Sequence, residues 1–125
     1  MAKILIIEDD PVISRMYQRV LKLSSHVAEI AEDGEVGLEM VRAVTYDLIV
    51  LDIMMPKVNG LDVLKQLKAH QETALVPVVI LTNSVSDKVI KAAMAMGAAR
   101  YLLKSDHDPM EVVEIVEDVL RSKKS

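Results

Sequence analysis

The 125-residue chain is long enough for one hydrophobic core, and 51% of its residues are hydrophobic, so it needs no covalent cross-links to fold. The absence of Cys excludes disulfides, thiolate metal sites and cysteine nucleophiles. Because 19 Asp and Glu residues outnumber 15 Lys and Arg residues, the formal net charge is -4, which argues against direct nucleic-acid binding.

Five short apolar runs alternate with longer stretches of helical periodicity and predict strands near residues 3–7, 27–31, 47–51, 77–81 and 100–103. The runs are rich in β-branched residues, which is typical of strands that helices cover on both faces. Asp10-Pro11 and Asp108-Pro109 each place a capping carboxylate before a proline, and they predict two helix starts.

The alternation of strands and helices predicts an α/β fold, with a parallel five-stranded sheet between two layers of helices. With no linker or repeat in the sequence, we expect one domain over residues 1–125. No apolar run approaches the roughly 20 residues that span a bilayer, and no signal peptide is recognisable, so we expect a cytoplasmic protein without a membrane partner.

Polar residues follow the apolar runs directly: Glu8 and Asp9 after the first, Asp52 after the third, Thr82 after the fourth and Lys104 after the fifth. Because parallel strands end at one edge of their sheet, we expect these side chains to converge there. Carboxylates without His or Cys favour Mg²⁺ over zinc. Together with an ammonium and a hydroxyl, such a site suits phosphoryl transfer. Taken singly, Thr82 could be a turn residue and Lys104 a solvated charge.

Four segments make the chain resemble the receiver domains of response regulators, the CheY-like proteins of two-component signal transduction. They are ILIIEDDP at 4–11, DLIVLDIMMP at 47–56 followed by Asn59-Gly60, ILT at 80–82 and YLLK at 101–104. The segments occur in the family's order and spacing over the whole chain. The resemblance implies a flavodoxin-like (βα)5 fold with strand order 2-1-3-4-5.

The resemblance also implies the chemistry of the site. Asp52 would be the nucleophile that accepts a phosphoryl group from a sensor histidine kinase or a phosphotransfer protein. Glu8, Asp9, Asp52 and the backbone carbonyl of Met54 would bind Mg²⁺. The chain would catalyse its own phosphorylation and dephosphorylation without a separate turnover substrate, so whether it counts as an enzyme stays open.

A second set of implied roles concerns the switch. Thr82 and Lys104 would bind phosphoryl oxygens, and the ring of Tyr101 would turn inward as Thr82 moves. The surface formed by the fourth helix, the fifth strand and the fifth helix would then bind an unknown downstream protein or a second copy of the chain. With no DNA-binding domain in the sequence, we expect the output to be a protein interaction.

Departures from the family pattern define the alternatives. Ser105 replaces the usual Pro after Lys104, which favours a trans peptide bond, and Asn83 replaces a small residue. Both substitutions leave open the alternative that the chain is a degenerate receiver, which binds partners without being phosphorylated. The second alternative is a haloacid-dehalogenase-like hydrolase. Such an enzyme would need a second Asp, as general acid, at the position that Met54 occupies. Since Met54 has no acid or amide to orient water, we expect slow self-dephosphorylation.

Overall fold

The computed structural model describes residues 1–124, so Ser125, the last residue of the expected domain, lies outside it. Its strands are β1 (Lys3–Ile7), β2 (Val27–Ala31), β3 (Leu48–Leu51), β4 (Val78–Thr82) and β5 (Arg100–Leu103). Its helices are α1 (Pro11–Leu23), α2 (Gly34–Ala43), α3 (Gly60–Ala69), the short α4 (Gln71–Ala74), α5 (Asp87–Ala95), the 3₁₀ turn η1 (Lys104–Asp106) and α6 (Pro109–Lys124). The first and last residues of each strand differ from the predicted ones by at most one position.

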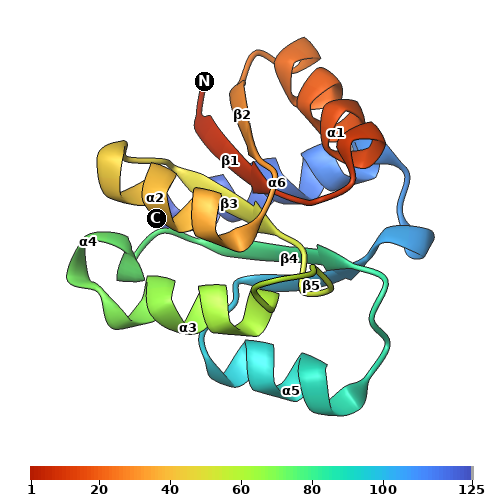
Figure 1. Cartoon of the computed structure of the whole chain (residues 1–125). Helices are drawn as coiled ribbons and strands as arrows, with labels where there is room; N and C mark the ends of the chain where they lie inside the picture. The colour runs from red at the N-terminus through yellow and green to blue at the C-terminus, as the bar shows by residue number, and fades with distance from the viewer. Residues whose placement is uncertain (125) are drawn as a thin grey trace.

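The five strands form one parallel sheet in the order β2-β1-β3-β4-β5, which confirms the predicted flavodoxin-like α/β topology (Figure 1). β1 lies between β2 and β3, and Ile7 pairs with Ala31 on one side and with Leu51 on the other. The residues that follow β1 and β3 therefore leave the sheet side by side, at the edge formed by the carboxyl ends of the strands.

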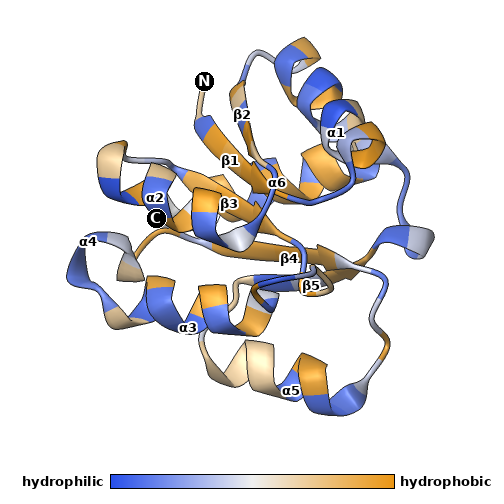
Figure 2. Cartoon of the chain, in the orientation of Figure 1, coloured by the Kyte–Doolittle hydropathy of each residue, from blue (hydrophilic) through white to orange (hydrophobic). Residues whose placement is uncertain are grey.

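Two layers of helices cover the sheet because successive strand side chains point to opposite faces. Along β1, Ile4 and Ile6 pack against α1 and α6, whereas Leu5 and Ile7 pack against α2, α3 and α5. In Figure 2 the strands are largely hydrophobic, while the helices alternate between hydrophobic and polar residues. The long apolar runs of the sequence thus correspond to strands buried on both faces.

Both predicted helix starts are confirmed. The Asp10 carboxylate accepts hydrogen bonds from the backbone N–H groups of Val12 and Ile13, at 2.9 and 3.4 Å. At the start of α6, Asp108 and Glu111 each accept a bond from the other's backbone N–H, which is a capping box. The short helix α4 was not predicted. Within residues 1–124, no helix is long and apolar enough to cross a membrane.

The loop between β3 and α3 packs tightly against the strand end that carries Asp52. A Cβ atom on Gly60 would lie 2.3 Å from the backbone oxygen of Asp52, so only glycine fits at this position. In the same loop, Lys57 adopts a φ of 59°, a left-handed conformation that is uncommon for residues other than glycine. The turn thus leaves the strand in a narrowly defined conformation.

Candidate functional site

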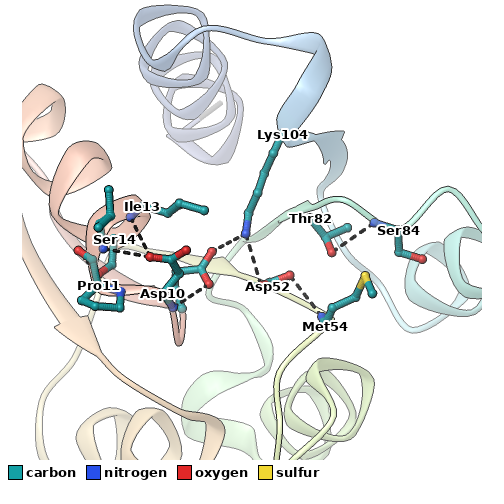
Figure 3. A network of polar contacts seen from close by, with 11 residues as sticks. Asp10, Pro11, Ile13, Ser14, Asp52, Met54, Thr82, Ser84 and Lys104 are labelled. Atoms are coloured by element: carbon teal, nitrogen blue, oxygen red, sulfur yellow. Dashed lines mark hydrogen bonds and ion pairs between the residues drawn. The ribbon is translucent and has the colours of Figure 1, made fainter.

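The residues expected to converge do so at the carboxyl edge of the sheet, where Asp52, Thr82 and Lys104 lie close to one another in Figure 3. Lys104 follows β5 and reaches across the sheet to the ends of β1 and β3. Its ammonium donates to Glu8 Oε1 and, at 3.3 Å, to Asp52 Oδ2. The Lys104–Ser105 peptide bond is trans, as are the other peptide bonds of the described chain. Lys104 therefore reaches the Asp52 carboxylate across a trans bond, with serine rather than proline after it.

Asp52 is held in a fixed orientation. Its side chain is buried, with 4% of the residue exposed, and Oδ1 accepts a hydrogen bond from the backbone N–H of Met54 at 3.1 Å. Because Oδ2 faces Lys104, each carboxylate oxygen has a defined donor. The backbone N–H of Asp52 donates to the carbonyl of Ile7, which ties this residue to β1 as well.

Glu8 is also buried, whereas its neighbour Asp9 is exposed. While Glu8 Oε1 accepts from Lys104, Oε2 accepts from the backbone N–H of Asp10 at 3.1 Å. One carboxylate oxygen from each of Glu8, Asp9 and Asp52 lies within 4.8 Å of the others. Three hard oxygen donors at this spacing can share a divalent cation such as Mg²⁺.

The electrostatics of the site favour a bound cation. Burial raises the pKa of Glu8 from 4.5 to about 7, and the Asp52 charge acts in the same direction, although the bond to Lys104 opposes it. Burial by itself would lower the pKa of Lys104, but the Glu8 bond and the charges of Asp52 and Glu8 outweigh burial and raise it. One ammonium is thus placed among three carboxylates.

We expect Glu8→Gln to stabilise the metal-free protein at pH 8 by about 1–3 kcal/mol. A carboxyl whose pKa is higher in the folded than in the unfolded state binds a proton more tightly when folded. The stability of the wild type therefore falls as the pH rises from 4.5 to about 7, and the neutral amide avoids this loss. Urea denaturation in EDTA at pH 4.5 and pH 8 measures the difference.

The exposed Glu39 on α2 provides the control, since Glu39→Gln should change stability little at either pH. An advantage for Glu8→Gln that is the same at both pH values would contradict the raised pKa of Glu8.

Thr82 and Tyr101, the two expected switch residues, are joined through Ser84. The Thr82 hydroxyl is fully buried and accepts a hydrogen bond from the backbone N–H of Ser84 at 3.4 Å. The half-buried Tyr101 donates its phenolic O–H to the backbone carbonyl of Ser84 at 3.0 Å. Asn83, which lies between Thr82 and Ser84 in the sequence, is exposed.

Sequence reasoning gave no role to three features of the site. These are the Asp10 N–H that binds Glu8, the Ser84 backbone that links Thr82 to Tyr101, and the close packing of Gly60 on Asp52. Two of them are backbone contacts, which carry no signature in residue type. Only Gly60 offered a signal, through its place in the Asn59-Gly60 motif.

Comparison with known proteins gives consistent matches. The family model for the response regulator receiver domain matches residues 4–117. Response regulator ArlR of Staphylococcus saprophyticus is 36% identical over 118 residues, covering 93% of this chain and 50% of ArlR. The chain thus spans about half the length of such curated relatives.

Solved structures agree with these sequence matches. Chemotaxis protein CheY4 of Vibrio cholerae superposes with a TM-score of 0.88 at 26% identity, covering 95% of this chain and 98% of CheY4. The Mn²⁺-bound form of response regulator Rcp1 superposes with a TM-score of 0.80 at 28% identity, covering 98% of this chain and 89% of Rcp1.

Proposed function

Because this chain belongs to the response regulator receiver domain family, we propose that it is a phosphorylation switch with Asp52 as the phosphoryl acceptor. The phosphoryl donor would be the phosphohistidine of a sensor histidine kinase or of a phosphotransfer protein. One observation carries the proposal: the buried Asp52 carboxylate lies beside the Lys104 ammonium and the Glu8–Asp9 pair. The cytoplasm, where ATP-dependent kinases act, is the compartment this role requires.

In the transfer step, a carboxylate oxygen of Asp52 attacks phosphorus while the bond from phosphorus to the donor imidazole nitrogen breaks. The imidazole leaves and takes up a proton, and Asp52 becomes a mixed anhydride. Met54 and Lys104 hold the carboxylate in place before the attack. Lys104 would then pair with a phosphoryl oxygen and stabilise the charge that spreads over the group.

We place Mg²⁺ among Glu8, Asp9, Asp52 and the backbone carbonyl of Met54. The donor set fits this ion, because carboxylate and carbonyl oxygens are the ligands it prefers. An Mn²⁺-bound form is known for Rcp1, to which this chain is similar, and it supports the proposal that a divalent cation binds at this site. When bound, Mg²⁺ neutralises charge on the phosphoryl oxygens.

Because the short α4 was not predicted, the fourth and fifth predicted helices are α5 and α6. The output of the switch would pass through Thr82 and Tyr101 to the face formed by α5, β5 and α6. The Thr82 hydroxyl would leave the Ser84 N–H and donate to a phosphoryl oxygen. The ring of Tyr101, which donates to the Ser84 carbonyl, would turn further inward as Thr82 moves. A downstream protein is the partner that we propose for this face, and a second copy of the chain is the other candidate. Direct binding of nucleic acid is not part of the proposal.

The test is to incubate the protein with acetyl phosphate and Mg²⁺ and to measure the intact mass. We expect a gain of one phosphoryl group, and we expect no gain when EDTA removes the metal ion. If the folded protein takes up no phosphoryl group even with excess Mg²⁺, the proposal fails, and the degenerate receiver that acts without phosphate becomes the better explanation.

A further inference from the structure

The side chain of Met54 is exposed to solvent at the proposed phosphorylation site. Met54 is 60% exposed, and its backbone N–H is held at 3.1 Å by Asp52 Oδ1. Its neighbour Met55 instead packs against the core. In Figure 3 the sulfur of Met54 extends to the side of Asp52 on which Thr82 and Ser84 lie. The backbone of Met54 is thus anchored to the acceptor carboxylate, while its thioether side chain is open to solvent.

The thioether sulfur is a weak hydrogen-bond acceptor, so in its native form Met54 does little to orient a water molecule. Oxidation to the sulfoxide converts this apolar side chain into a polar one that carries an oxygen. In the sulfoxide, Sδ takes the place of the Cδ of glutamine, so the new oxygen lies the same number of bonds from the backbone as a glutamine oxygen. The oxidised side chain would gain the acceptor that Met54 lacks.

We propose that Met54 is an oxidation site and that its sulfoxide accelerates hydrolysis of the phosphoryl group on Asp52. The inference rests on the proposed function. A peroxide oxidises the thioether by two electrons: the O–O bond breaks, an S–O bond forms and water is released. Phosphorylation would then be short-lived under oxidising conditions.

In the hydrolysis, the oxygen of a water molecule attacks phosphorus, and the bond from phosphorus to the Asp52 oxygen breaks. The Asp52 carboxylate is regenerated, and the water protons pass to inorganic phosphate and solvent. The sulfoxide oxygen accepts a hydrogen bond from the attacking water and orients it, without taking its proton. Its contribution is therefore positional, and the expected acceleration is moderate.

Other methionines provide internal comparisons. Met1, Met16, Met94 and Met110 are also exposed, but they lie at the N-terminus and on α1, α5 and α6, whereas Met40 and Met96 pack against the core. A peroxide should therefore oxidise the exposed methionines before Met40 and Met96. Among the methionines of residues 1–124, Met54 is the one whose backbone is hydrogen-bonded to Asp52.

The experiment combines peptide mapping with phosphoryl half-lives. The protein is treated with hydrogen peroxide and mapped for sulfoxides by mass spectrometry. It is then phosphorylated with acetyl phosphate, and the half-life is measured after the donor is removed. We expect the Met54 sulfoxide to form as fast as that of Met110 and faster than those of Met40 and Met96. The half-life should shorten about threefold or more, and methionine sulfoxide reductase should restore it.

Three variants make the test specific to Met54. Without oxidant, Met54→Gln should shorten the half-life as the sulfoxide does. Met54→Leu should have a half-life that peroxide does not change, whereas Met94→Leu should respond as the wild type does. An unchanged or longer half-life in a protein that carries the Met54 sulfoxide would overturn the inference. Failure of the untreated protein to take up any phosphoryl group would instead refute the proposed function, and mapping would still decide whether Met54 is oxidised.

Discussion

A protein carrying Asp52→Asn is expected to take up no phosphoryl group from acetyl phosphate and Mg²⁺. The asparagine amide has no carboxylate oxygen with which to form a mixed anhydride. The shape of the site should survive, since Asn Oδ1 can accept the same bond from the Met54 N–H. Intact-mass analysis of both proteins, under conditions that label the wild type fully, measures the loss.

The neighbouring Asp10 provides a matched control. Its carboxylate caps α1 rather than facing Lys104, and asparagine caps helices about as well as aspartate. Asp10→Asn should therefore take up one phosphoryl group, as the wild type does. A full mass gain in Asp52→Asn would show that another residue is the acceptor and would refute the proposed role of Asp52.

Replacing Lys104 with Met should separate metal binding from phosphoryl transfer. Loss of the ammonium removes one charge-stabilising donor from the transition state, so phosphoryl uptake should slow by roughly 100-fold. The same ammonium donates to an oxygen of Glu8 and to one of Asp52, two of the carboxylates proposed to bind Mg²⁺. Its removal should therefore strengthen Mg²⁺ binding about tenfold or more, because the carboxylates lose a competing cation.

Calorimetric titration with Mg²⁺ at pH 8, above the pKa of Glu8, tests the binding half of this prediction. Lys68→Met is the control, because Lys68 is similarly half-buried but donates to the backbone carbonyls of Ala74 and Val76. It should leave Mg²⁺ affinity unchanged. Weaker Mg²⁺ binding in Lys104→Met would show that Lys104 supports the metal site rather than competing with it.

The sequence predicts the sheet well because each strand is a compact apolar run and the topology follows general rules for parallel sheets. The same rules place Glu8, Asp52 and Lys104 at one edge. Strand ends are less certain, since both faces are apolar and only the flanking residues set the limits. Asp47 was placed in a strand, but its carboxylate accepts a bond from the Lys3 N–H just outside β3.

What the sequence does not predict depends on the positions of individual atoms. Residue types do not reveal that Lys104 bonds to Glu8 as well as to Asp52, because the choice depends on lengths and angles across three strands. The Ser84 contacts of Thr82 and Tyr101 use backbone groups that every residue has. The exposure of Met54 beside the partly buried Met55 likewise follows from the loop conformation.

The separation of 96 residues between Glu8 and Lys104 has a consequence for protein synthesis. A nascent or prematurely terminated chain that ends before β5 would carry the acceptor but not the ammonium, so its Asp52 would be a poor substrate for any donor. Competence for the proposed phosphorylation would thus arise only after Lys104, directly behind the last strand, has been translated, and incomplete chains would contribute little background.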